Sequence, residues 1–179
     1  LVADVVPDTF AFGWARTRTD PALLALLRDP QWQPLVVFPG EYAAPERVVR
    51  SLRSPAASCG ESATRPLFIL LDGTWGEARK MFSRSPYLDH LPVLSLELAQ
   101  ASQYTLRRSR RDDHFCTSEV AALCLALAGD RVAAQTLAAY LAVFTHHYLQ
   151  AKHQLPVAWD GAEHQRWREV TAPVADQSP

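Results

Sequence analysis

A continuous apolar run, LFILL at residues 67–71, constrains the fold more than any other segment of this sequence. A strand that is apolar at every position needs cover on both faces, which is typical of a parallel strand between helices. The run ends at an Asp-Gly pair at residues 72–73, and a helix with its apolar residues on one face is predicted over about residues 75–83. This strand–turn–helix order indicates an α/β fold.

Other segments repeat the alternation of strands and helices. Strands are predicted at residues 10–16, 34–38 and 93–98, and helices at residues 21–27, 42–53, 117–128 and 130–155. Thr117 is predicted to cap the helix over residues 117–128 and Gly129 to end it. The predicted buried stripe of the last helix consists of Leu137, Leu141, Phe144 and Tyr148. Together these segments predict one domain over residues 1–179, with a mostly parallel sheet flanked by helices and a loosely held tail after about residue 158.

Composition narrows the class of protein. The chain has 179 residues, 48% of them hydrophobic and 21% charged, as in ordinary globular proteins. No apolar run reaches bilayer length and no signal-peptide pattern opens the chain, so no membrane association is expected. Cys59, Cys116 and Cys124 form no CxxC pair, which favours a reducing cytoplasm and gives no zinc pattern. The first residue is Leu1 and not Met, so we expect that upstream residues are missing.

Positive charge is unevenly distributed. The formal net charge is only −1, yet four arginines crowd into Arg107, Arg108, Arg110 and Arg111. Such a run is usually a solvated surface, and the two aspartates that follow partly offset it. Contact with phosphates is the alternative.

Three segments are predicted to converge at one edge of the sheet, because ligands bind beyond the carboxyl ends of parallel strands. They are residues 38–41, residues 71–75 and the loop that leads to residues 116–119. On spacing alone, the structural interpretation is favoured: Asp72 caps the following helix and Trp75 packs in the core.

The resemblance to a known family changes this balance. LDGTWGEARKMFSRSPYLDHLP at residues 71–92 resembles the signature of the DTW-domain family, whose Asp-x-Thr-Trp core stands here as Asp72, Thr74 and Trp75. VVFPGE at 36–41 and YTLRRSRRDDHFCTSEVAALCLAL at 104–127 are similar to the flanking family segments, and Trp14-Ala15-Arg16 resembles an early strand. The resemblance covers about residues 10–150 in the family's order. The cysteine cluster that opens many relatives is absent, so zinc is not expected.

This resemblance implies a knotted SPOUT-like fold and a specific reaction. The implied activity transfers the 3-amino-3-carboxypropyl group of S-adenosylmethionine to N3 of a tRNA uridine, giving acp3U and 5′-methylthioadenosine. A methyltransferase or an rRNA aminocarboxypropyltransferase on the same fold is one alternative, and a non-catalytic RNA-binding module is another. The tRNA position and the oligomeric state stay open, with a homodimer as one option.

The implied site centres on Asp72 and Trp75 as catalytic residues. Asp72 is either the base that removes the N3 proton or the ligand of the cofactor's amino group, and the Trp75 ring faces the sulfonium. Thr117 and Ser118 open a helix suited to a carboxylate or a phosphate, and Glu119 suits the same dipole. The candidate cofactor-binding residues are Phe38, Pro39, Gly40, Glu41, Leu71, Thr74, Trp75, Leu94, Tyr104, Leu106, Cys116 and Thr117. The candidate RNA-binding residues are Arg16, Arg79, Lys80, Arg84, Arg107, Arg108, Arg110 and Arg111.

Overall fold

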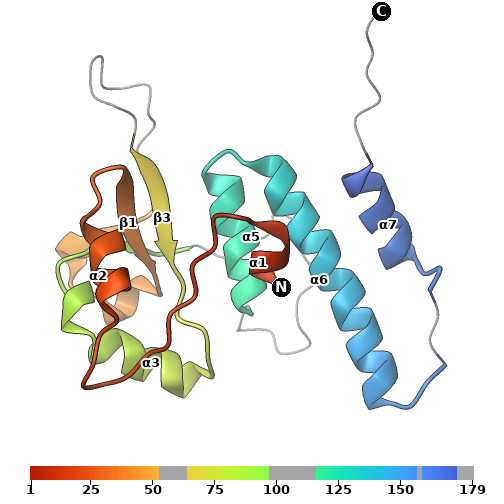
Figure 1. The fold of residues 1–179 in the computed structure, drawn as a ribbon, viewed down its shortest axis with the longest axis horizontal. Helices are drawn as coiled ribbons and strands as arrows, with labels where there is room; N and C mark the ends of the chain where they lie inside the picture. The colour runs from red at the N-terminus through yellow and green to blue at the C-terminus, as the bar shows by residue number, and fades with distance from the viewer. Residues whose placement is uncertain (53–63, 97–115, 157–158, 173–179) are drawn as a thin grey trace, which may run out of the picture. The chain divides into compact units, whose positions relative to one another are not determined.

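The computed structural model describes residues 1–52, 64–96, 116–156 and 159–172 (Figure 1). The chain divides into two compact units. Phe10–Arg107 form the first unit, and Leu1–Thr9 with Arg108–Pro179 form the second. The first holds the sheet and the second holds helices, and each unit is described by itself.

The sheet has four strands in the order β2-β4-β1-β3, and every described pairing is parallel. The strands are β1 (Trp32–Val37), β2 (Val48–Val49), β3 (Arg65–Ile69) and β4 (Val93–Leu94). In β1, one of the two inner strands, Leu35, Val36 and Val37 are all buried, so both faces of this strand are covered. This is the arrangement that uninterrupted apolar runs predict.

Short helices connect and cover these strands. The helices of this unit are α2 (Pro21–Arg28), α3 (Trp75–Ser83) and the 3-10 helices η1 (Gly40–Tyr42), η2 (Pro45–Arg47) and η4 (Pro86–Leu88). The Asp20 carboxylate caps α2 by accepting a hydrogen bond from the Ala22 amide. The core joins Val36 and Val93 from the sheet to Ala78 from α3.

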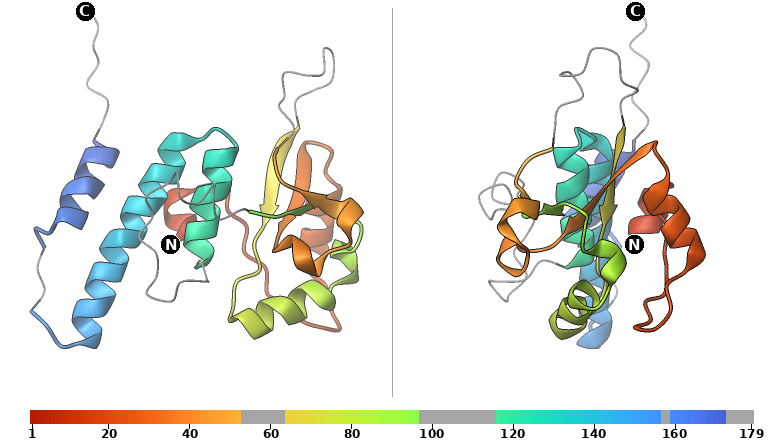
Figure 2. Two further views of the ribbon diagram at one scale, coloured as in Figure 1. Left: turned by 180° about the vertical axis from the view of Figure 1, so that it is seen from behind. Right: turned by 90° about the vertical axis from the view of Figure 1, so that its left-hand side faces the viewer.

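The second unit is helical (Figure 2). It contains α1 (Val2–Val5), α5 (Thr117–Leu127), α6 (Arg131–Lys152) and α7 (Ala162–Thr171). Gly129 has a φ of +89°, a left-handed conformation that glycine adopts without strain, and it separates α5 from α6. Helix α6 packs against both α5 and α7.

Most predicted elements are confirmed, with shifted boundaries. The strands at 34–38, 67–71 and 93–98 correspond to β1, β3 and β4, although β4 ends at Leu94 and residues 97–98 lie outside the described part. The predicted helix over 75–83 is α3, with the same bounds. A helix does begin at Thr117, but Cys116 occupies the cap position.

Two elements in the sheet unit are wrong. Residues 10–16 form no strand, and their only β-type pairing is an isolated bridge between Ala15 and Arg18. The Trp14 indole anchors this segment by donating a hydrogen bond to the Ser85 hydroxyl at 2.9 Å. The predicted helix over 42–53 is replaced by η2 and β2. The Arg47 guanidinium donates to the Leu88 and Leu91 carbonyls, and the β-branched pair that follows it pairs with β4.

The predicted stripe of α6 is wrong at its carboxyl end. Leu137 is fully buried, but Phe144 is 48% exposed and Tyr148 is 56% exposed. Helix α5 has 11 residues and α6 has 22, so a hairpin of the two covers only the first half of α6. Phe144 and Tyr148 lie beyond that half and stack on each other.

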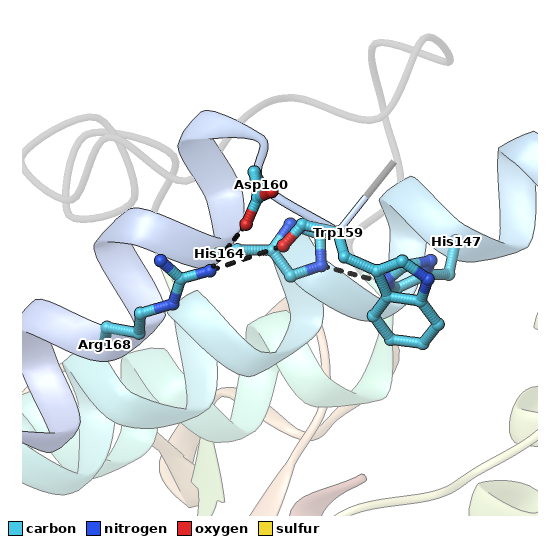
Figure 3. A network of polar contacts seen from close by, with 5 residues as sticks. All are labelled: His147, Trp159, Asp160, His164 and Arg168. Atoms are coloured by element: carbon cyan, nitrogen blue, oxygen red, sulfur yellow. Dashed lines mark hydrogen bonds and ion pairs between the residues drawn. The ribbon is translucent and has the colours of Figure 1, made fainter. Parts of the chain in front are cut away.

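The segment after residue 158 contains α7, where the sequence predicts a loosely held tail. Its docking on α6 depends on ring contacts that no periodic pattern reveals. His164 is buried and its Nε2 lies 2.8 Å from Nε2 of His147 on α6 (Figure 3). Trp167 packs on Tyr140 with ring centroids 5.2 Å apart.

Candidate functional site

The carboxyl ends of β1, β2 and β4 are tied together by the turn that follows β1. Because these strands are parallel, their ends meet at one edge. The Phe38 amide donates to the Leu94 carbonyl at 3.2 Å, and the Gly40 amide donates to the Ser95 hydroxyl at 3.0 Å. A Cβ atom at Gly40 would lie 3.0 Å from Cγ1 of Val48 and 3.2 Å from Ser95, so any other residue here would require these neighbours to shift.

The segment after β3 forms a tightly capped helix start. The Thr74 amide and hydroxyl both donate to the Glu77 carboxylate, at 2.8 and 2.6 Å, and the Glu77 amide donates back to the Thr74 hydroxyl. These bonds, first from the Thr74 side chain and then from its backbone, lower the pKa of Glu77. Thr74 thus has a structural role as a helix cap. Its contact with a cofactor stays a prediction.

Four aromatic side chains form a cluster at this edge: Phe38, Tyr42, Trp75 and Phe82. The Phe38 side chain is buried, and its ring stacks on two of the others, Trp75 and Phe82. It is 5.4 Å from Trp75 at an interplanar angle of 8°, and 4.5 Å from Phe82 at 11°. Trp75 is nevertheless 39% exposed, so it is a surface residue supported by the core and not simply a core residue.

Tyr42 extends the aromatic cluster, and sequence reasoning missed it. Its ring meets Phe38 and Trp75 edge-on, at 5.5 and 5.7 Å. The Arg79 guanidinium lies over the Tyr42 ring, 5.0 Å from its centroid. The available signal was an aromatic residue directly after the Pro-Gly-Glu turn at a strand end. Phe82 was predicted only as part of the apolar face of the helix over residues 75–83, and not as part of a site.

The remaining predicted residues of this unit differ in exposure. Pro39, which precedes η1, and Glu41, which lies within it, are exposed. Leu71 is half-buried after β3, and Asp72, which follows it, is exposed. Leu94 is fully buried, so it supports the site from the core and lines no surface. The exposed cations of the predicted RNA-binding set are Arg16, Arg79, Lys80 and Arg84.

The amino-terminal end of α5, in the helical unit, is capped by Glu119 from its first turn. The Cys116 amide donates to the buried Glu119 carboxylate at 2.7 Å, which gives Glu119 a capping role. Partial burial of the sulfur is the largest cause that raises the pKa of the Cys116 thiol, and the negative charge of Glu119 adds to it. Cys116 is an exposed residue, and the raised pKa of its thiol makes it a weak nucleophile.

Several predicted residues lie outside the described part of the chain: Tyr104, Leu106, Arg107, Arg108, Arg110 and Arg111. Among the described residues, no three histidine, cysteine, aspartate or glutamate side chains are grouped so that they could hold a metal ion. Within the same ranges, no helix is both long and apolar enough to cross a membrane.

Comparison with known proteins identifies one matching domain family and a curated relative. The DTW domain matches residues 1–149. A curated relative from Drosophila melanogaster, tRNA-uridine aminocarboxypropyltransferase 2, is 32% identical over 77 residues, which are 43% of this chain and 31% of the relative. The match thus spans about a third of that relative's length. No solved structure matches the chain.

Proposed function

The chain belongs to the DTW-domain family, and on this premise we propose that it is a tRNA-uridine aminocarboxypropyltransferase with a SPOUT-like fold. The observation that carries the proposal is the position of the Asp-x-Thr-Trp core. Asp72 and Trp75 are both exposed where β3 passes into α3, at the edge where ligands bind to parallel sheets. The name of the Drosophila relative supplies the reaction class and the tRNA substrate.

The residues at this edge fit S-adenosylmethionine, whose ammonium and sulfonium groups are both cationic. An exposed carboxylate at Asp72 and an exposed indole at Trp75 both attract cations, and the stacked Phe38 ring holds the indole in place. The turn at residues 39–41 offers main-chain atoms for the adenosine. When bound, the cofactor supplies a carbon attached to a sulfonium leaving group.

Asp72 has two possible tasks in this reaction. As a base, it takes the proton from uracil N3 while the nitrogen–carbon bond forms and the carbon–sulfur bond breaks, with the electron pair leaving on the thioether. Such proton transfer contributes about 10²–10⁴-fold to a rate. As a ligand, Asp72 instead holds the cofactor's ammonium group and orients the reacting carbon.

Mass spectrometry of tRNA nucleosides tests the proposed function. The protein is incubated with unmodified tRNA and S-adenosylmethionine, and both nucleosides and cofactor products are analysed. We expect a uridine that carries one aminocarboxypropyl group, together with methylthioadenosine. A methylated nucleoside would instead make the chain a methyltransferase. Failure to bind the cofactor in calorimetry would favour a non-catalytic RNA-binding module.

An Asp72→Asn variant separates the two tasks of the carboxylate. If Asp72 is the base, we expect cofactor affinity within about twofold of wild type and turnover reduced by about 10²–10⁴-fold. Loss of cofactor binding would assign the ligand role. Asp89→Asn, at another exposed aspartate of the same unit, is the matched control and should change neither quantity.

A further inference from the structure

We propose that Tyr42, with Arg79 over its ring, is the positioning residue that stacks on a nucleotide of the tRNA substrate, while Trp75 serves the cofactor. This inference rests on the proposed function and assigns the two exposed aromatic rings of the site to different ligands. Tyr42 lies outside the Asp-x-Thr-Trp core, and only the structure places it beside Trp75.

The position of Tyr42 is fixed by the strand ends. The Tyr42 amide donates to the Pro39 carbonyl at 3.1 Å, which closes η1, and the Gly40 amide ties the same turn to Ser95 at 3.0 Å. The ring is held edge-on to Phe38 and Trp75. A ligand that stacks on Tyr42 therefore meets a side chain whose conformational entropy is already largely lost.

Tyr42, Trp75 and Arg79 form one exposed patch. Trp75 and Arg79 are four residues apart on α3 and so share a face of the helix. Tyr42 is 37% exposed, Trp75 is 39% exposed, and Arg79 is exposed beside them. Aromatic rings next to a guanidinium group are the usual means by which proteins bind unpaired nucleotides, with stacking for the base and a cation for the phosphate.

Charge decides which ligand meets which ring. The sulfonium of the cofactor is cationic, so the Arg79 guanidinium on the Tyr42 ring repels it. The same guanidinium attracts RNA phosphate, and its contact with the ring keeps it in place. The cofactor is thus directed to the Trp75 side of the patch and the nucleotide to the Tyr42 side.

Separate measurements of tRNA and cofactor binding test this assignment. Dissociation constants are determined for unmodified tRNA and for S-adenosylmethionine with wild type, Tyr42→Ala and Tyr42→Phe. Loss of one base stack corresponds to about 1–3 kcal/mol, so Tyr42→Ala should weaken tRNA binding by roughly 5- to 150-fold. The cofactor affinity of Tyr42→Ala should stay within about twofold of wild type, and Tyr42→Phe should bind tRNA as wild type does. Arg79→Ala should weaken tRNA binding alone.

Matched controls guard against general effects. Tyr148→Ala removes another exposed tyrosine, and Arg166→Ala removes another exposed arginine, both from the helical unit. Neither should lower tRNA affinity as much as the site variants. If Tyr42→Ala does not fold, Tyr42→Leu keeps the apolar volume without the π face and gives the same comparison.

The outcomes distinguish this inference from the proposed function. If wild type forms the modified uridine and Tyr42→Ala binds tRNA as wild type does, only the assignment of Tyr42 is overturned. An equal loss of cofactor and tRNA affinity overturns it as well. If wild type neither binds nor modifies tRNA, the proposed function fails and the inference fails with it.

Discussion

At the scale of single residues, Phe38 connects the core to the site. Its ring is only 6% exposed, yet it stacks on the exposed Trp75 and touches Tyr42 edge-on. Stacked and edge-on aromatic pairs contribute about 0.5–1.5 kcal/mol each beyond the area that they bury. The same ring therefore stabilises the fold and fixes the geometry of the surface residues.

Gly40 and Gly76 provide a matched pair of substitutions. A Cβ at Gly40 meets Val48 at 3.0 Å, whereas one at Gly76 meets nothing within 4 Å. Gly40→Ala should therefore lower the free energy of unfolding by about 1–3 kcal/mol. Gly76→Ala should raise it by up to about 1 kcal/mol, because alanine favours helix. Urea denaturation measures both, and equal effects would contradict the close approach at Gly40.

Cys124 predicts a loss of stability at alkaline pH. Burial raises the pKa of its thiol to about 12, above the value of about 8.5 for a free cysteine. Above pH 9 the unfolded chain releases this proton and the folded chain retains it. The stabilising contribution of the protonated thiol to the free energy of unfolding is therefore complete below pH 8.5 and declines as pH rises toward 12. Cys124→Ala should melt with a smaller difference between pH 8 and pH 10.5 than wild type. An unchanged difference would exclude Cys124 as its source.

At the scale of elements, the sequence predicted those whose signal is local. The helix over residues 75–83 was found because its apolar residues lie on one face directly after a strand and an Asp-Gly turn. The capping box of Thr74 and Glu77 in the structure is a further local feature of the same helix. The two-residue strand β2 was missed because its structure depends on pairing with β4, a contact between residues 45 positions apart. Local pattern cannot reveal such a contact.

The candidate site was predicted in part for the same reason. Asp72 and Trp75 follow from a short motif, and the structure exposes both. Tyr42 was missed because its contacts with Trp75 and Arg79 join residues that are far apart in the sequence and are brought together by the fold. Leu94 was included as a residue of the strand predicted over 93–98, but its complete burial depends on neighbours on both faces of the sheet.

The pairing of α6 with α7 should depend on the contact between His147 and His164. Their Nε2 atoms lie 2.8 Å apart, with one ring as donor and the other as acceptor, and His164 is buried. His147→Ala removes this contact, so hydrogen exchange of residues 162–171 should become faster. His153→Ala, at an exposed histidine near the end of the same helix, is the matched control and should leave the exchange unchanged. Equal exchange in both variants would contradict a role of the histidine contact.

At the scale of the whole molecule, a net charge of −1 gives no general attraction to RNA, so the proposed tRNA binding requires local clusters of cations. The densest is Arg107, Arg108, Arg110 and Arg111, which lies outside the described residues. Each phosphate neutralised lowers the logarithm of affinity by about 0.7–0.9 per tenfold rise in salt. If all four arginines contact phosphates, replacing them with glutamine should reduce this slope by about 3. A reduction close to zero, with tRNA binding retained, would make the cluster a solvated surface and leave the phosphate contacts to Arg79, Lys80 and Arg84.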